Sequence, residues 1–283
     1  MKRILLSCLC FAVALSAAAQ SRIVTDSIQS QTLKCIQKYN VYLPDRYDAN
    51  REYPVVYLLH GLYGRYSDWV RQGNMKAVAD PLMASGEICE MVIIMPNAGD
   101  FDVHHYQNGY FNMPDWPYED FFFQEFLPEV ERKYHCGGSK DKRAIMGLSM
   151  GGGGSIVYAQ RHPDLFSSTY GMSAWLDNKH REVRGSDMPG SKLAITDQSV
   201  REHSALDFMD RADENTIGQL KSVKWFLDCG DDDTLMPLSE ELHLKMRAAG
   251  IPCEFRVRDG AHTWEYWHTA LYLALPFASR NFR

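Results

Sequence analysis

Short apolar runs alternate with longer amphipathic stretches along most of the 283-residue chain. The runs at residues 54–59 and 91–95 are apolar throughout, without the alternation of a strand that has one solvent-exposed face. We therefore expect both to be strands buried on two faces. A mostly parallel sheet with helical crossovers, an α/β fold, is predicted by this alternation. Further runs of strand length lie at residues 143–146, 166–172, 224–229 and 252–257.

The stretches between these runs have the spacing of amphipathic helices. Apolar side chains recur at four-residue steps through residues 118–134, with acids early and Arg132 and Lys133 late, as a helix dipole favours. Residues 75–85 predict another helix, which Gly86 would end. Further helices are predicted at residues 151–161, at 239–249 and from about 264, and an antiparallel strand pair at 22–28 and 33–43.

One stretch departs from this pattern, because residues 177–215 are polar and charged with few apolar positions. We interpret it as a small insertion over the sheet and the active site rather than as a separate domain. An α/β fold of roughly 200 to 250 residues is often a single domain. Residues 20–283 therefore predict one domain, with helices on both faces of its sheet.

The N-terminus has the layout of an export signal. A basic start at residues 1–3 precedes an apolar run at 4–15, and small residues up to Ala19 follow in the A-x-A pattern of a cleavage site. A membrane anchor is the alternative, but the run is shorter than the roughly 20 residues that span a bilayer. We predict that residues 1–19 are a signal peptide, that Gln20 begins the mature protein, and that the protein is periplasmic or extracellular without stable membrane insertion.

The charge balance and the cysteines narrow the possible partners. The formal net charge is −6, and it becomes −8 without the predicted signal peptide, which carries two basic residues and no acid. A nucleic-acid partner would require a basic patch on the protein, so we expect no nucleic-acid partner. The five remaining cysteines are irregularly spaced, which indicates neither a disulfide framework nor a metal-binding pair. We expect no cofactor and no metal.

A five-residue motif supplies a candidate nucleophile. Residues 147–151 read Gly-Leu-Ser-Met-Gly, which places Ser149 between the predicted strand at 143–146 and the predicted helix at 151–161. That context is typical of a nucleophile elbow, a strained turn between a strand and a helix. The flanking glycines would let neighbouring backbone approach closely. Ser149 is therefore the predicted nucleophile.

On a fold of this kind an acid and then a histidine should follow the nucleophile along the chain. Asp231, Asp232 and Asp233 come directly after the predicted strand at 224–229, and their adjacency leaves the choice open. Asp233 is preferred and Asp232 is next, with a solvated turn as the alternative for all three. His262 follows the last predicted strand and is the predicted base.

Two backbone N–H groups should bind the oxyanion, one directly after the nucleophile and one in a loop after an early strand. Met150 would supply the first. The loop after the strand at 54–59 reads His-Gly-Leu-Tyr-Gly over residues 60–64, so Leu62 is the candidate for the second. His60 is expected to support this loop.

Four motifs resemble those of the esterase D and feruloyl esterase group of α/β-hydrolases, at residues 60–62, 147–152, 230–235 and 260–264. Acetyl xylan esterases, tributyrin esterases and S-formylglutathione hydrolases look related to this group. The similarity covers nearly all of residues 33–280, and it implies an α/β-hydrolase fold and a Ser-His-Asp serine esterase. In that group the acid lies in a G-x-x-D-x-hydrophobic loop, which selects Asp233. The group's oxyanion donor follows the glycine after the early histidine, which agrees with Leu62.

The resemblance leaves the acyl group and the alcohol open. With the export signal, it predicts removal of acetyl, feruloyl or other short acyl groups from acylated oligosaccharides or small esters, through an acyl-enzyme. An acyltransferase with the same triad and an alcohol acceptor is the alternative. Trp69, Trp175 and Trp264 flank the predicted active-site loops and are candidates for stacking on a phenolic acyl group or a sugar, with core packing as the alternative for each.

Overall fold

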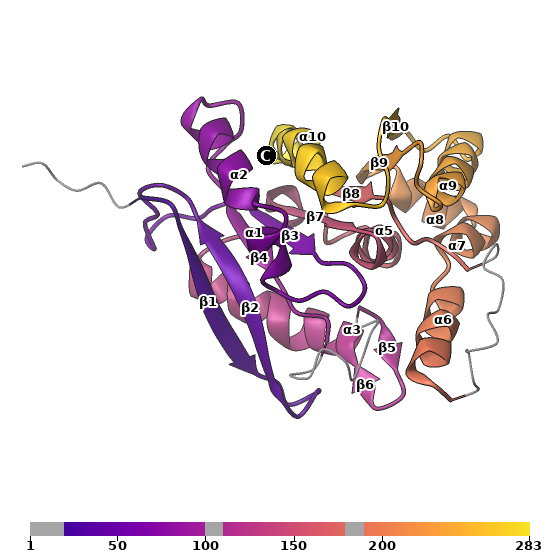
Figure 1. Ribbon diagram of the computed structural model, residues 1–283, viewed down its shortest axis with the longest axis horizontal. Coiled ribbons are helices and arrows are strands. Elements are labelled where there is room, and N and C mark those ends of the chain that lie inside the picture. The colour runs from indigo at the N-terminus through magenta and orange to yellow at the C-terminus, as the bar shows by residue number, and fades with distance from the viewer. Residues whose placement is uncertain (1–19, 100–109, 179–189) are drawn as a thin grey trace, which may run out of the picture.

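A sheet of eight strands runs through the protein, with helices on both of its faces (Figure 1). The computed structural model describes residues 20–99, 110–178 and 190–283. The signal peptide predicted for residues 1–19 lies outside the described residues.

The described residues contain ten strands and twelve helices. The strands are β1 (Arg22–Gln29), β2 (Ile36–Leu43), β3 (Val55–Leu59), β4 (Val92–Met95), β5 (Asn112–Met113), β6 (Trp116–Pro117), β7 (Arg143–Leu148), β8 (Ser168–Met172), β9 (Lys224–Gly230) and β10 (Cys253–Arg258). The helices are α1 (Asp68–Arg71), α2 (Met75–Ala84), α3 (Tyr118–Phe121), the π-helix η1 (Phe122–Phe126), α4 (Leu127–Tyr134), the 3₁₀ helix η2 (Lys140–Lys142), α5 (Met150–Arg161), α6 (Lys192–Glu202), α7 (Ala205–Arg211), α8 (Glu214–Leu220), α9 (Met236–Ala248) and α10 (Trp264–Asn281).

The strand order in the large sheet is β1-β2-β4-β3-β7-β8-β9-β10, and β5 and β6 form a separate small pair. β1 pairs with β2 and β2 with β4 in antiparallel fashion, whereas every other pairing in the large sheet is parallel. The predicted mostly parallel sheet and the predicted N-terminal antiparallel pair are therefore confirmed. Because β7 to β10 are parallel neighbours, their carboxyl ends lie along one edge of the sheet.

The side chains of β3 show how the sheet is buried on two faces. Val55, Tyr57 and Leu59 pack into one apolar cluster together with residues of α4, α5 and α9. Val56 and Leu58 point to the other face and pack against α2 and α10. A strand covered by helices on both faces needs apolar residues at every position, which explains the unbroken apolar run.

The helix predicted at residues 118–134 is continuous but contains one wide turn. The N–H of Leu127 donates to the carbonyl of Phe122, five residues back, which defines the π-helical η1. Pro128 follows directly and has no N–H to give to the carbonyl four residues before it. The wide turn accommodates this missing hydrogen bond, a local effect that apolar periodicity does not predict.

The stretch predicted as a polar insertion, residues 177–215, is helical where it is described. Ser191, Ser204 and Asp213 precede α6, α7 and α8, and each side chain accepts a hydrogen bond from an N–H of the first turn. Such caps let a polar stretch form short helices. That this stretch lies over the active site stays a prediction.

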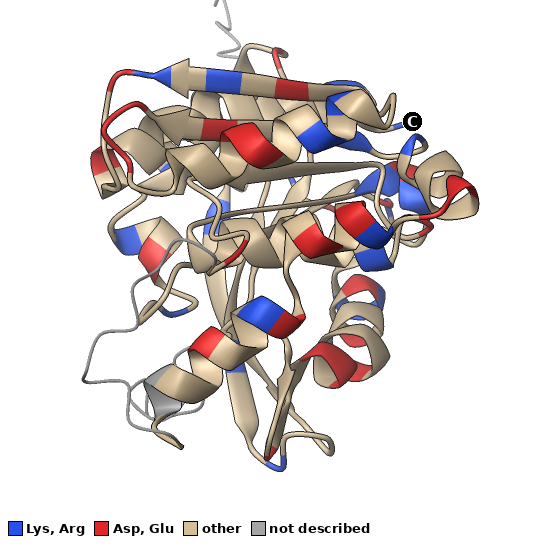
Figure 2. Cartoon of the chain, turned by 90° about the vertical axis from the view of Figure 1, so that its right-hand side faces the viewer, with Lys and Arg blue, Asp and Glu red and all other residues tan. Residues whose placement is uncertain are grey.

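Charged side chains of both signs are interspersed along the helices on the side of the molecule that Figure 2 shows. Some of them join helices. Lys245 of α9 pairs with Asp210 of α7, and it also lies 3.7 Å from the carboxylate of Glu241 one turn earlier. The pair with Asp210 links α7 to α9, which packs against β9, so the described part of this stretch contacts a helix of the sheet's outer layer. That it belongs to the same domain stays a prediction.

Candidate active site

Ser149 lies at a sharp turn between β7 and α5. Its φ of 53° and ψ of −118° are unusual for a residue with a side chain. The N–H of Ser149 donates to the carbonyl of Met172 at 2.8 Å, which holds the turn against β8. A Cβ at Gly151 would lie 2.5 Å from the carbonyl oxygen of His60, and one at Gly147 would lie 2.5 Å from that of Gly151. The two glycines of the motif are therefore required by close backbone approach.

The structure brings Ser149, His262 and Asp233 together, although they are far apart in sequence. The His262 Nε2 lies 2.9 Å from the Ser149 Oγ, and the His262 Nδ1 lies 2.8 Å from the Asp233 Oδ2. A carboxylate can only accept, so we assign the imidazole proton to Nδ1, which leaves Nε2 free to accept from the serine hydroxyl. The side chain of His262 is 37% exposed and that of Asp233 is 0% exposed.

Among the three adjacent acids, only Asp233 contacts the imidazole. Asp231 and Asp232 are exposed, and the Asp231 carboxylate accepts from the N–H of Gly260 at 3.0 Å. Burial alone would raise the pKa of the Asp233 carboxyl. Hydrogen bonds from His262, the N–H of Leu235 and Ser173 outweigh burial and hold that pKa below its ordinary value of 3.8. Asp233 is thus kept ionised, as a partner of an imidazole should be.

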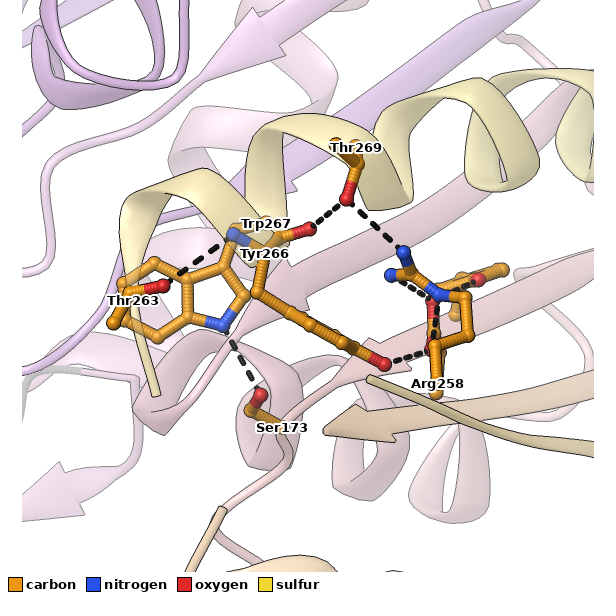
Figure 3. Close-up of polar contacts among 8 residues, drawn as sticks. Ser173, Arg258, Thr263, Tyr266, Trp267 and Thr269 are labelled. Carbon is orange, nitrogen blue, oxygen red and sulfur yellow. Dashed lines mark hydrogen bonds and ion pairs between the residues drawn. The ribbon is translucent and has the colours of Figure 1, made fainter. Parts of the chain in front are cut away.

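Two residues that the sequence analysis missed support this arrangement. The ring of Trp267 packs edge-on against the His262 imidazole, with centroids 4.8 Å apart. The Trp267 Nε1–H donates to the Oγ of the buried Ser173 at 3.1 Å (Figure 3). Ser173 follows β8 with a φ of 47°. In the sheet, β8 lies between β7, which precedes Ser149, and β9, which precedes Asp233. A polar residue directly after such a strand is the sequence signal that could have identified Ser173.

The loop after β3 lies against the nucleophile. A Cβ at Gly61 would be 3.6 Å from the Ser149 Cβ, so the backbone of this loop passes directly beside the serine. Met150 is the first residue of α5, where a helix N–H has no partner within the helix. The N–H groups of Leu62 and Met150 therefore come from the two segments that adjoin Ser149. That they bind an oxyanion stays a prediction.

His60 is buried and fixes the orientation of that loop. Its Nε2 accepts from the N–H of Ala98 at 2.9 Å, so its Nδ1 carries the proton and donates to the carbonyl of Gly61 at 2.8 Å. Burial lowers the pKa of His60, which keeps the ring neutral. The Gly61 carbonyl and the Leu62 N–H belong to one planar peptide, so His60 also sets the direction of the Leu62 N–H.

The three candidate tryptophans differ in their surroundings. Trp69 is 1% exposed and donates its Nε1–H to the carbonyl of Leu59 at 2.9 Å, so it packs in the core and offers substrate no surface. For Trp69, this burial in α1 favours core packing, the alternative to a substrate contact. Trp175 is partly exposed, and its backbone N–H donates to the Ser149 carbonyl at 2.9 Å. Trp264 is partly exposed beside Trp69, and substrate contacts of Trp175 and Trp264 stay predictions.

Within residues 20–99, 110–178 and 190–283, no group of three or more metal-ligating side chains is placed to hold a metal ion. In the same residues, no helix is long and apolar enough to cross a membrane. Cys89, Cys136, Cys229 and Cys253 form no disulfide within the described residues.

Comparison with known proteins adds a family and several relatives. A family model described as "Putative esterase" matches residues 30–278. An endo-1,4-beta-xylanase/feruloyl esterase of Xylanibacter ruminicola is 25% identical over 248 residues, which are 86% of this chain and 29% of the relative. An esterase of Mycobacterium tuberculosis is 33% identical over 246 residues, which are 80% of this chain and 52% of the relative. The chain thus spans about half or less of the length of these relatives.

Solved structures show the same fold. A ferulic acid esterase is 48% identical, with a TM-score of 0.87 over 93% of this chain and 100% of that chain. An S-formylglutathione hydrolase from Staphylococcus aureus is 20% identical, with a TM-score of 0.73 over 92% of this chain and 100% of that chain. The second match shows a shared fold alone. Together they confirm the predicted α/β-hydrolase architecture.

Proposed function

Because this chain belongs to the esterase family, as its motifs predicted, we propose that it hydrolyses carboxylic esters through an acyl-enzyme at Ser149. The family and the feruloyl esterase relatives identify a serine carboxylic ester hydrolase. The observation that carries the mechanism is the continuous hydrogen-bonded path from the Ser149 Oγ through His262 to Asp233. This path matches the roles of nucleophile, base and orienting acid.

In the first half of the reaction, the Ser149 Oγ attacks the ester carbonyl carbon while the His262 Nε2 takes the hydroxyl proton. The carbonyl oxygen becomes an oxyanion, to which the N–H groups of Leu62 and Met150 donate. Collapse of this intermediate breaks the bond to the leaving alcohol, which receives the proton from His262. Asp233 stays ionised throughout and stabilises the imidazolium through the Nδ1–H.

In the second half, water attacks the acyl-enzyme and His262 again acts as base. The exposed fraction of the His262 side chain, 37%, gives water direct access to the base. The proton then returns to the Ser149 Oγ as the free acid leaves. The cycle therefore needs no group beyond the three side chains and the two N–H donors.

We propose the substrate class of this chain from the activities that the names of its relatives state. The ferulic acid esterase at 48% identity and the feruloyl esterase of Xylanibacter ruminicola support feruloyl, acetyl or other short acyl esters of carbohydrate. Trp175 and Trp264 are the partly exposed rings near the triad that would contact such a substrate. The relatives reported above are esterases and hydrolases by name, so they favour hydrolysis over transfer to an alcohol. Export through the N-terminal segment is part of this proposal.

The decisive experiment compares Ser149→Ala with Ser155→Ala. Ser155 lies in α5, the helix that follows Ser149, and its buried hydroxyl contacts the backbone carbonyls of Gly152 and Tyr170, so its loss is a matched control. With p-nitrophenyl acetate, Ser149→Ala should lose at least about 10³-fold in kcat while remaining folded. The wild type should release p-nitrophenol in a burst, and Ser155→Ala should keep most activity.

The same preparations should then be offered feruloylated and acetylated xylan oligosaccharides beside simple butyrate esters. Release of ferulate or acetate from the oligosaccharides at rates above those for the butyrates would support the proposed substrate class. Retention of most activity by Ser149→Ala would refute the mechanism.

A further inference from the structure

A second buried acid lies close to the triad and is not used by the proposed mechanism. Asp228 belongs to β9, the strand that leads to Asp233, and its side chain is fully buried. An unpaired carboxylate in such a place would be strongly unfavourable, so its partners define what it does.

Four contacts surround the Asp228 carboxylate. Arg258 binds both oxygens, with the Nε 3.1 Å from Oδ1 and the Nη2 3.0 Å from Oδ2. The Tyr170 hydroxyl donates to Oδ2 at 2.7 Å, and the Tyr266 hydroxyl donates to Oδ1. Burial and the neighbouring carboxylate raise the pKa of Tyr266, so its hydroxyl keeps the proton that it donates. The carboxylate is therefore fully satisfied by side chains from three other elements.

Two of these partners flank the proposed base. Arg258 is the last residue of β10 and Tyr266 is in the first turn of α10, so His262 lies in the loop between them. Figure 3 shows the Tyr266 side chain extending from α10 toward Arg258. Both ends of the loop that carries His262 are thus bound to one buried carboxylate.

Further contacts make this attachment rigid. The Arg258 guanidinium carbon lies 4.1 Å from the centre of the Tyr266 ring, and the Nη1 donates to the Oγ1 of Thr269 at 3.0 Å (Figure 3). A Cβ at Gly260 would lie 2.6 Å from the Cδ2 of Tyr266, so the loop backbone runs directly along that ring. The loop cannot move away from Asp228 without breaking several of these contacts.

We propose that Asp228, Arg258 and Tyr266 form a clamp that sets the position of His262 relative to Ser149. These are positioning residues, because the hydrogen bonds of Arg258 and Tyr266 described above go to Asp228 and Thr269 and not to His262 or Ser149. The proposal rests on the proposed function, in which the His262 Nε2 must lie within hydrogen-bond reach of the Ser149 Oγ. Displacement of a catalytic group by about 1 Å can lower a rate by roughly 10²-fold.

The chain offers a matched control, since a second buried cluster has the same chemistry elsewhere. The Arg143 Nε and Nη2 lie 2.6 and 2.8 Å from the two oxygens of Glu131, and the Tyr57 hydroxyl donates to Oε1 at 3.0 Å. Arg143 is the first residue of β7, whereas Ser149 follows the other end of that strand. Tyr57→Phe and Tyr266→Phe each remove one buried hydroxyl from a carboxylate-arginine pair, but only Tyr266 adjoins the His262 loop.

The experiment measures the acylation rate constant, the apparent substrate affinity and the melting temperature of wild type, Tyr266→Phe and Tyr57→Phe. The probe is p-nitrophenyl acetate, with acylation followed in the pre-steady-state burst. Both variants should melt at similarly lowered temperatures. Tyr266→Phe should acylate about tenfold more slowly or worse, with substrate affinity close to that of wild type. Tyr57→Phe should acylate within about twofold of wild type.

The rate of labelling by a fluorophosphonate gives a second readout, because it depends on the Ser149 and His262 geometry but not on ester binding. It should fall in Tyr266→Phe and not in Tyr57→Phe. Equal acylation rates in the two variants would overturn the clamp, whether both are high or both are low. A wild type that turns over no ester would instead overturn the proposed function, and the clamp with it.

Discussion

Replacement of Gly151 by alanine tests why the nucleophile helix begins in glycine. A Cβ at this position would lie 2.5 Å from the carbonyl oxygen of His60 and 2.7 Å from that of Leu59. Both are backbone atoms at the end of β3, so no side chain can rotate away. Since non-bonded contacts are optimal near about 3.5 Å, α5 would have to retreat from β3 by about 1 Å.

The free energy of unfolding should fall as a result. Overpacking of this kind costs about 1–3 kcal/mol, and the better helix propensity of alanine returns up to about 1 kcal/mol. We expect a net loss of about 1–2 kcal/mol for Gly151→Ala. Gly218 of α8 is the control, because a Cβ there would meet nothing within 4 Å. Gly218→Ala should raise the free energy of unfolding by about 0.4–1 kcal/mol.

Activity should separate the two variants further. A retreat of α5 moves Met150 and Ser149 away from the loop that follows His60. The nucleophile and the two proposed oxyanion donors then no longer point at the same substrate carbonyl. We expect kcat for p-nitrophenyl acetate to drop by roughly 10²-fold in Gly151→Ala and to stay unchanged in Gly218→Ala. Urea unfolding and steady-state kinetics measure both effects. A Gly151→Ala enzyme as stable and as active as wild type would refute the argument from close backbone approach.

Two further predictions concern the oxyanion donors and the triad acid. Leu62→Pro removes the proposed N–H donor and should lower kcat by roughly 10²–10³-fold. Leu62→Ala keeps the N–H and should keep most activity. Equal kcat values for the two variants would exclude the Leu62 N–H as an oxyanion donor. The folded-state pKa of Asp233 lies below 3.8, so the stability gained from its ionised form is present above that pH and is lost as pH falls through the folded value. The difference in unfolding free energy between wild type and Asp233→Asn, measured with urea, should therefore shrink below about pH 3.8, and a difference that widens on acidification would contradict this sign.

Local patterns in the sequence predict the elements and the turn at Ser149 well, because their causes are local. The apolar run of β3 follows directly from burial on two faces, and the glycines around Ser149 follow from a turn that only a few residues define. The position of His262 after the last strand is likewise a property of chain order. These features can be predicted without knowing which distant residues are in contact.

The features that sequence did not predict depend on contacts between distant segments. The local pattern alone preferred Asp233 but left Asp232 open, and the fold separates the two because it buries Asp233 and leaves Asp231 and Asp232 in solvent. Trp69 carries the same side chain as Trp175, and only the packing of α1 decides that one is buried. Ser173 and Asp228 have no motif of their own, since their partners come from other strands and from α10.

The strand order has a consequence for how the protein loses activity. β10 is the last strand of the sheet and has a single neighbour, β9, and several of its side chains, including that of Val257, are exposed. Opening free energies differ across a protein, and weakly covered elements exchange their amide protons first. The base thus follows an edge strand, while the nucleophile follows β7 inside the sheet. On heating, catalytic activity should therefore be lost through local opening of β10. The amide protons of the central strands should still be protected from hydrogen exchange at that temperature.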